Sequence, residues 1–287
     1  MKLLEGGRAG QIWRDGNTVI RPSGAWTPTV HRFLRHLRSR GFSGAPDPIE
    51  ITGNQDVVSY VTGRVCEDLS DQFVGSERML LSAANLLREF HSASQGFLEA
   101  DREIQTWMLP PREPYEIVCH GDYAPYNVAT ADHEAVGIID FDTAHPAPRV
   151  WDLAYSVYPW APLSDPANPH VTFGLDEQLR RAEIFCTAYG ATGEDRLQLP
   201  EVICRRLQAL VDFMLASAAA GDATFTEDVN AGDALLYMSD MDYVRRHRDR
   251  LLEALCRRKD VWPWTSPGDH YDILISRARP AHGIPMG

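Results

Sequence analysis

Residues 120–144 read HGDYAPYNVATADHEAVGIIDFDTA, and this stretch decides the fold. The stretch and the residues just before it contain three short apolar segments with the composition of strands, separated by polar turns. A hairpin between the last two segments would bring Asn127 and Asp140 to the same end, next to the loop that holds Asp122. The stretch therefore predicts a site in which three oxygen-bearing side chains lie at the ends of short strands.

The donor atoms of this site favour a hard cation. Carboxylate and amide oxygens without a thiolate favour magnesium over zinc, and magnesium bound by few side chains usually completes its coordination with phosphate oxygens and water. A nucleotide is therefore implied. Lys2 and Lys259 are the only lysines, and no G-K-[ST] sequence is present. A P-loop is excluded, and a phosphate clamp must use arginine.

The spacing of these residues matches a known pattern. D-x-x-x-x-N, followed by D-F at the end of a strand, is the spacing of the protein-kinase catalytic loop and metal-binding aspartate. Here the loop reads H-G-D-Y-A-P-Y-N, the later motif reads I-D-F-D, and a D-L-A triplet follows at 152–154. In this form the sequence resembles the aminoglycoside phosphotransferase and choline kinase-like family of small-molecule kinases. The short interval before the triplet leaves no room for the long activation segment of a protein kinase.

The resemblance implies a bilobal, protein-kinase-like α+β fold. A small N-terminal β-sheet lobe with one helix would span residues 1–62 and bind the nucleotide. A larger, mainly helical lobe would span residues 63–287 and hold the catalytic and substrate-binding residues. Along the chain, strand-like patterns end at Thr62-Gly63, and helical spacing of apolar residues begins at 76–94.

The resemblance also implies a role for each residue of the quoted stretch. Asp122 would accept the proton of the substrate hydroxyl as the catalytic residue. Asn127 and Asp140 would be the metal ligands that hold magnesium against the nucleotide phosphates. His120 and Asp152 would order the catalytic loop through hydrogen bonds.

The N-terminal lobe departs from the family pattern in one respect. The family pairs a strand lysine with a helix glutamate, but the equivalent strand, Thr18–Arg21, places Arg21 at the lysine position. The following helix, expected over Thr27–Arg40, contains no acid. His31 lies near the expected glutamate position and cannot form the same ion pair with Arg21. The guanidinium of an arginine can donate hydrogen bonds to two phosphate oxygens, so Arg21 is expected to contact phosphate.

The other nucleotide contacts come from a glycine-rich loop over the phosphates and from a hinge whose backbone bonds the adenine edge. The implied nucleotide-binding residues are Arg21, Gly6, Gly7, Gly10, Tyr60 and Val61. Two roles remain open for Asp142, which would either contact a second metal or cap the following turn.

The composition of the chain indicates which partners it binds and in which compartment it is expected. The chain has 287 residues, a formal net charge of −12, and 40 acids against 28 bases. This charge disfavours nucleic acid as a partner. Five cysteines without a C-x-x-C pair are typical of reduced thiols in the cytoplasm. The N-terminal residues lack the pattern of a secretion signal, and the apolar stretches are too short to span a membrane. The oligomeric state is left unassigned.

The expected activity is transfer of the γ-phosphate of ATP or GTP, with Mg²⁺, to a hydroxyl of a small molecule. An aminoglycoside-like or other antibiotic is the first candidate, and a choline-like or other metabolite alcohol is an alternative. Because the lysine–glutamate pair is missing, a nucleotide-binding pseudokinase or regulator also stays open. A metal-dependent phosphoesterase that uses His120, Asp122, Asn127 and Asp140 is a further alternative.

The substrate lobe gives weaker signals. Five acids lie on or before a long helix expected from residue 233 onward: Glu227, Asp228, Asp233, Asp240 and Asp242. They would either hold a polyamine or aminosugar, or form a solvated helix face. Trp262 and Trp264 would either wall a sugar pocket or anchor the tail.

Overall fold

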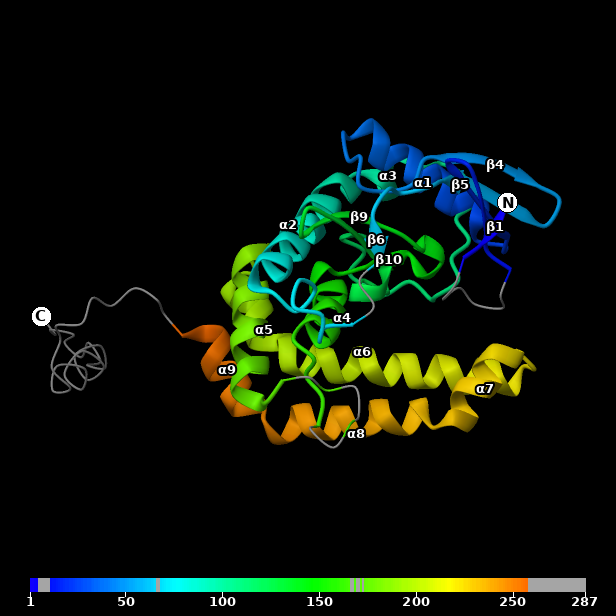
Figure 1. Ribbon diagram of the computed structural model, residues 1–287. Helices are drawn as coiled ribbons and strands as arrows, with labels where there is room; N and C mark the ends of the chain where they lie inside the picture. Colours follow the sequence, from blue (N-terminus) through cyan, green and yellow to red (C-terminus); the bar gives the residue numbers. More distant parts are fainter. Residues whose placement is uncertain (5–10, 66–67, 166–167, 169–170, 172, 258–287) are drawn as a thin grey trace, which may run out of the picture. The chain divides into compact units, whose positions relative to one another are not determined.

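Five antiparallel strands form the N-terminal sheet, against which helix α1 packs (Figure 1). The structure, a computed structural model, describes residues 1–4, 11–65, 68–165, 168, 171 and 173–257. The strand order is β1-β2-β3-β5-β4, with bounds Lys2–Leu3, Trp13–Asp15, Thr18–Pro22, Gln55–Ser59 and Pro48–Thr52. Gly16 turns the β2–β3 hairpin with a φ of 60°, which a residue without Cβ adopts readily.

Helix α1 spans Thr27–Ser39 and follows its predicted pattern. Pro28 occupies the first turn, where its missing N–H has no role in the helix. Its apolar side chains at i, i+3, i+4 and i+7 are all buried: Val30, Phe33, Leu34 and Leu37. The helix thus fixes one side of the N-terminal sheet.

The strands around the quoted stretch form two small sheets. β7 (Ile117–Cys119) pairs with β10 (His145–Ala147), and β8 (Val128–Ala131) forms a hairpin with β9 (Glu134–Ile138). Asp132 and His133 turn this hairpin with φ values of 51° and 64°, as in a type I′ turn. β6 (Arg64–Val65) pairs with β8. All three predicted strands are present, but the first pairs with a strand that the sequence did not predict.

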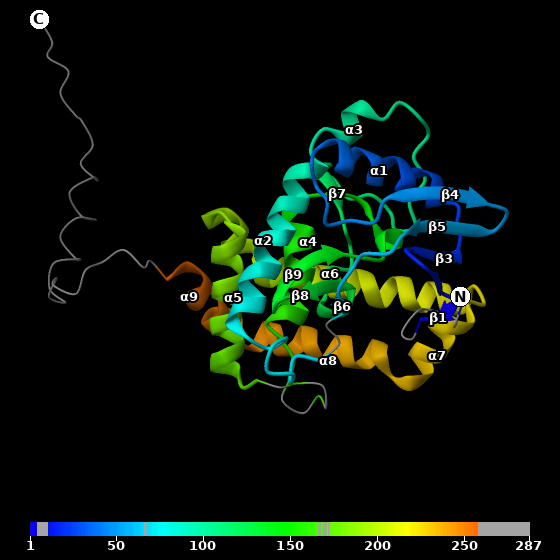
Figure 2. The ribbon, with the colours of Figure 1, turned by 45° about the horizontal axis from the view of Figure 1, so that its top comes forward.

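The rest of the described chain is mainly helical (Figure 2). The helices are α2 (Glu77–Ser94), α3 (Phe97–Ala100), α4 (Arg149–Trp160), α5 (Leu175–Tyr189), α6 (Gly193–Ala219), α7 (Ala223–Ala231), α8 (Asp233–Arg246) and α9 (Arg248–Cys256). Helix α6 packs against α4, α7, α8 and α9. The single helix predicted from residue 233 onward is wrong, because the chain leaves helical geometry at His247 and divides it into α8 and α9.

A chain of aromatic rings connects α1 to the loop after β7. The ring of Phe90 on α2 lies 6.0 Å from that of Phe33 and 5.8 Å from that of Phe141, with the rings edge to face. The ring of Phe141 lies 4.8 Å from that of His120. Edge-to-face contacts of this kind stabilise beyond area burial by about 0.5–1.5 kcal/mol each. The N-terminal sheet and the site strands are therefore parts of one packed core.

Met1–Cys256 form one unit and Arg257–Gly287 form a second. Trp262 and Trp264 lie outside the described residues, so both of their predicted roles stay predictions. The predicted lobe boundary after residue 62 falls between β5 and β6 within the first unit. Across the residues with a described structure, no helix has both the length and the apolar character needed to cross a membrane.

Candidate active site

The loop from His120 to Asn127 is anchored by Asp152, on the buried face of α4. Its carboxylate accepts hydrogen bonds from the backbone N–H groups of His120 at 2.7 Å and Gly121 at 2.9 Å, and from Nε2 of His91 at 2.9 Å. Burial alone would raise the pKa of Asp152, but His91 and the other donors lower it to about 2. Asp152 is therefore ionised and holds the loop in place.

Two features of the loop itself support this arrangement. His120 donates from Nε2 to the Ile139 carbonyl at 2.9 Å and accepts at Nδ1 from the Asp122 backbone N–H at 3.2 Å. Gly121 has a φ of 82°, and a Cβ at this position would lie 2.4 Å from the Thr143 carbonyl oxygen. The His-Gly pair thus fits this turn for steric and hydrogen-bonding reasons.

Asp122 is held by its own loop. Its Oδ1 accepts from the Tyr126 hydroxyl at 2.7 Å, and its Oδ2 accepts from Nδ2 of Asn127 at 2.8 Å. Burial raises the pKa of Asp122, and the hydrogen bond from Tyr126 opposes this shift. The result is a fixed carboxylate with a stronger affinity for a proton than an exposed aspartate has.

Asp122 and Tyr126 line two neighbouring cavities. The first, which we name the sheet cavity, has a volume of about 490 Å³ and lies between the N-terminal sheet and the β8–β9 hairpin. It contains these predicted site residues: Arg21, Tyr60, Val61, Asp122, Asn127 and Asp140. The structure therefore brings together every predicted site residue that it describes. Gly6, Gly7 and Gly10 lie outside the described residues.

Arg21 is the centre of an ion-pair network in the sheet cavity. Its Nε lies 2.9 Å from Asp56, its Nη1 lies 3.1 Å from Asp140, and its Nη2 lies 2.9 Å from Asp142. Burial alone would lower the pKa of Arg21, but the charges of Asp142, Asp140 and Asp56 raise it. Burial raises the pKa of Asp142 to about 6, against the charge of Arg21. Asp142 thus contacts Arg21, which neither of its two predicted roles included.

Asp56 was missed by the sequence analysis. It lies on β5 directly across from Arg21 in the strand register, and its side chain is 1% exposed. His31 on α1 contacts the other carboxylate oxygen at 2.6 Å. Burial alone would raise the pKa of Asp56, but His31 and Arg21 lower it. The acid that accompanies the strand cation therefore comes from the adjacent strand, and His31 contacts that acid.

The donor atoms around Asp122 fit a magnesium–nucleotide complex. Both side-chain hydrogen bonds that Asn127 makes to described residues use Nδ2 as the donor, so its Oδ1 is available for a cation. Asp140 is half exposed, at 51%, and one of its oxygens accepts from Arg21. Among the residues that the structure describes, no group of three or more His, Cys, Asp or Glu side chains is arranged to hold a metal. An ion here would need phosphate oxygens or water to complete its coordination.

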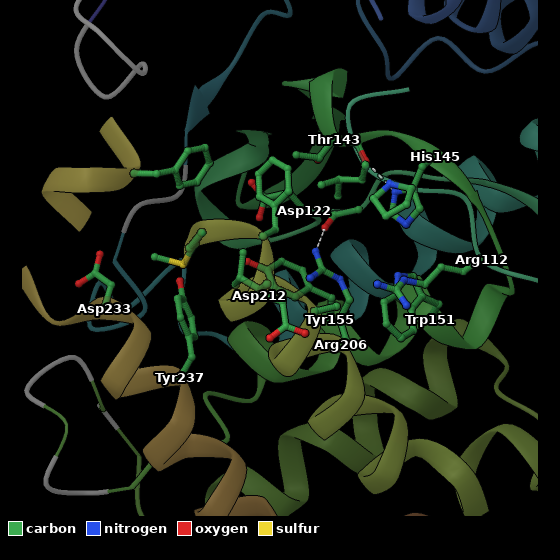
Figure 3. Close-up of a pocket in the computed structure, with 18 of the residues that line it drawn as sticks. Arg112, Asp122, Thr143, His145, Trp151, Tyr155, Arg206, Asp212, Asp233 and Tyr237 are labelled. Carbon is green, nitrogen blue, oxygen red and sulfur yellow. Dashed lines mark hydrogen bonds between the residues drawn. The ribbon is translucent and has the colours of Figure 1, made fainter. Parts of the chain in front are cut away.

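The second cavity, which we name the helix cavity, has a volume of about 350 Å³ (Figure 3). Asp122 extends into it from the catalytic loop, and α4, α6, α7 and α8 contribute most of its walls. The sequence alone did not indicate its main polar and aromatic residues, which are Arg112, Trp151, Tyr155, Arg206 and Tyr237. They come from distant segments, and no local pattern marks them.

The acids predicted to gather around the long helix do not form one cluster. Asp228 and Asp233 line the helix cavity. Asp240 is buried elsewhere, where it accepts from Tyr158 and Ser164 at 2.7 and 3.0 Å. Asp242 forms an exposed ion pair with the neighbouring Arg245.

The sequence of this chain is similar to those of known phosphotransferases and related proteins. Residues 95–200 match the phosphotransferase enzyme family (APH). The trifolitoxin immunity protein of Rhizobium leguminosarum bv. trifolii is 25% identical over 270 residues, which cover 88% of this chain and 97% of that protein.

Solved structures share the fold at low sequence identity. A choline/ethanolamine kinase family protein from Mesorhizobium loti has a TM-score of 0.55 at 15% identity, covering 85% of this chain and 88% of that chain. An ethanolamine kinase of Plasmodium vivax has a TM-score of 0.56 at 11% identity, covering 84% and 83%. An amicoumacin kinase in complex with AMP-PNP and Ca²⁺ has a TM-score of 0.57 at 10% identity, covering 83% and 89%. The predicted resemblance and the bilobal kinase-like fold are confirmed.

Proposed function

We propose that this chain is a small-molecule O-phosphotransferase that transfers the γ-phosphate of ATP or GTP to a hydroxyl of an acceptor in the helix cavity. One observation carries the proposal: the carboxylate of Asp122 lines both the sheet cavity and the helix cavity. A nucleotide in the first and an alcohol in the second would meet at this side chain. Two bound reactants in such an arrangement react as if at a high effective concentration.

In the proposed reaction, Asp122 orients the acceptor hydroxyl and takes its proton. The hydroxyl oxygen forms a bond to the γ-phosphorus while the bond from that phosphorus to the β–γ bridging oxygen breaks, and the nucleoside diphosphate leaves. The proton passes to the Asp122 carboxylate, whose pKa is raised by burial. Tyr126 and Asn127 fix both of its oxygens, so little reorganisation is needed.

The nucleotide would be held by the residues of the sheet cavity. Asn127 and Asp140 would hold Mg²⁺, which would offset the negative charge of the phosphates when bound. Arg21 would contact phosphate oxygens with its guanidinium, and Tyr60 and Val61 would bond the base through the backbone. Gly6, Gly7 and Gly10 would cover the phosphates. The complete set of Asp122, Asn127 and Asp140 in one cavity supports an enzyme over a nucleotide-binding regulator.

For the acceptor, we favour an antibiotic or toxin with a free hydroxyl, of which an aminoglycoside-like compound is one example. The support is indirect: one relative is named as a trifolitoxin immunity protein, and one protein of the same fold is an amicoumacin kinase. A choline-like alcohol is the alternative, since two proteins of the same fold belong to the choline or ethanolamine kinases.

The test is a screen of hydroxylated antibiotics, amines and metabolites with Mg²⁺ and either ATP or GTP, read by the mass gain of one phosphoryl group. We expect at least one acceptor to be modified, and Asp122→Asn to lower its turnover by about 10²- to 10⁴-fold. Asp132→Asn, in the exposed β8–β9 turn, is the matched control and should retain full activity. Tight nucleotide binding without any product would instead favour the regulator.

A further inference from the structure

Two buried donors of residues that line the helix cavity have no acceptor in the described part of the chain. Arg206 on α6 is 4% exposed and Trp151 on α4 is 7% exposed. Nε of Arg206 and Nε1 of Trp151 make no hydrogen bond to any described residue, although both side chains line the cavity. A buried polar group without a partner is unfavourable, and most such groups are satisfied by protein, water or a ligand. Because both side chains line the cavity, a ligand bound there could supply the missing acceptor atoms.

Arg206 is rigidly placed. Its Nη2 donates to the Gly121 carbonyl in the catalytic loop, and its guanidinium lies 4.3 Å from the ring centroid of Tyr155. The Trp151 ring lies 5.8 Å from the same guanidinium. Because these contacts fix the side chain, the unpaired Nε keeps a constant position relative to Asp122, which follows Gly121 directly.

A second guanidinium adds positive charge at the same place. The guanidinium of Arg112 lies 4.4 Å from the centroid of the Trp151 ring. Burial and the charge of Arg206 lower the pKa of Arg112, and the charge of Asp212 opposes this shift. No described carboxylate forms an ion pair with either arginine: the lining acid Asp212 is exposed and accepts instead from Nε2 of Gln208 at 2.8 Å.

His145, a further titratable group at this end, is uncharged. His145 donates from Nδ1 to the Thr143 carbonyl at 2.8 Å. Burial lowers the pKa of His145 to about 4, so the ring is neutral at neutral pH. Figure 3 shows Arg112, Trp151 and His145 on the side of the cavity away from Asp233 and Tyr237. One end of the helix cavity thus carries two cations that form no ion pair with a described carboxylate.

We propose that this end is an anion subsite, and that the acceptor is an alcohol that also carries a carboxylate. This inference rests on the proposed function and specifies the acceptor class. The carboxylate would accept from Nε of Arg206 and Nε1 of Trp151 and would balance Arg112, while the acceptor hydroxyl meets Asp122. A polycation such as an aminoglycoside would leave both donors unpaired and place positive charge against two arginines.

The test uses pairs of acceptors that differ only in the carboxylate. N-acetylserine, glycylserine and 4-hydroxyphenyllactate are compared with their methyl esters, and kanamycin and choline serve as cationic alcohols. We expect phosphorylation of at least one acid, with a kcat/KM at least tenfold above that of its ester. Phosphorylation of none of the acids, or equal use of acid and ester, overturns the inference.

Variants separate the subsite from general loss of structure. Arg112→Gln should lower kcat/KM for the acid by roughly 10- to 100-fold, mainly through KM, and leave the ester unchanged. Arg206→Gln should also lower kcat/KM for the acid. Because this variant removes the hydrogen bond to the Gly121 carbonyl as well, Arg112→Gln is the decisive variant. Arg205→Gln, exposed on the same helix, is the control. An unchanged KM for the acid in Arg112→Gln contradicts the subsite.

The outcomes also distinguish this inference from the proposed function. If kanamycin or choline is phosphorylated and the acids are not, the phosphotransferase stands and the anion subsite fails. If no compound is phosphorylated and no nucleotide is consumed, both fail.

Discussion

At the scale of single residues, the protonation of Asp122 sets the pH range of the proposed reaction. Burial raises its pKa, whereas the hydrogen bond from Tyr126 lowers it. The base must be ionised to take a proton, so activity is lost as the pH falls through this pKa. We expect the acid limb of kcat/KM to lie above about pH 3.9, the ordinary value for aspartate.

Removal of the Tyr126 hydroxyl should shift this limb. Tyr126→Phe deletes a hydrogen bond that favours the ionised form, so the acid limb should move to higher pH. The measurement is kcat/KM against pH for the variant, the wild type and Tyr115→Phe, a control at an exposed tyrosine. A limb that stays in place would show that Asp122 does not carry the limiting proton.

Asp56 gives a prediction for stability. Asp56→Asn leaves the buried Arg21 and His31 without their shared carboxylate. Loss of one partner of a buried pair usually lowers the free energy of unfolding by about 3–5 kcal/mol. Urea unfolding would measure this, with Asp47→Asn as the control, because Asp47 forms an ion pair with Arg38 in which both side chains are about half exposed. A loss below about 1 kcal/mol, typical of surface pairs, would contradict the account.

These residues also show what sequence reasoning can reach. The convergence of Asp122, Asn127 and Asp140 in one cavity could be predicted because their spacing is local and specific. Asp56 was missed because its role depends on strand register, which places it across from Arg21. The sequence of β5 gives no indication of which side chain lies opposite.

At the scale of elements, α4 controls the catalytic loop through Asp152. The pKa of Asp152 is lowered to about 2, below its unfolded value of about 3.9. A lowered pKa stabilises the folded state at pH values above the unfolded pKa, and this stabilisation is lost as the pH falls towards 2. A shift of this size corresponds to roughly 2–3 kcal/mol.

We therefore expect the free energy of unfolding to fall between about pH 4 and pH 2 in the wild type. Asp152→Asn should be less stable at pH 7 and should lose this part of the pH dependence. Urea unfolding at a series of pH values measures both. Parallel pH curves for the two proteins would contradict the role of the Asp152 charge.

The elements were predicted unevenly. α1 and α2 were predicted well because apolar residues recur at helical spacing, and Ser76 caps α2 by accepting from the Met79 N–H. β10 was not predicted, since its sequence His-Pro-Ala lacks the composition of a strand and its partner β7 lies far back in the chain. The break at His247 was missed because helical patterning continues on both sides of it.

At the scale of the whole molecule, Asp122 lines both cavities, which is why the proposed reaction assigns one residue to two ligands. The sheet cavity was foreseeable because its key residues belong to one motif and one resemblance. The helix cavity was not, because Arg112, Trp151 and Arg206 meet only after the helices pack. The shape of the helix cavity therefore depends on tertiary packing and cannot be predicted from any single segment of the sequence.

Nucleotide and metal should stabilise the folded protein together. A ligand that binds only the folded state at 100 times its Kd adds about 2.7 kcal/mol. We expect ATP or GTP with Mg²⁺ to raise Tm, and EDTA to remove most of this rise and to abolish turnover. Equal Tm values with nucleotide in the presence of Mg²⁺ or EDTA would argue against metal ligands at Asn127 and Asp140.

A crystal structure with a non-hydrolysable nucleotide and Mg²⁺ would show whether nucleotide and acceptor meet at Asp122. We expect the base beside Tyr60 and Val61, the metal on Asn127 and Asp140, and the γ-phosphate facing Asp122, which lines both cavities. A nucleotide bound elsewhere, or a γ-phosphate directed away from Asp122, would contradict this expectation.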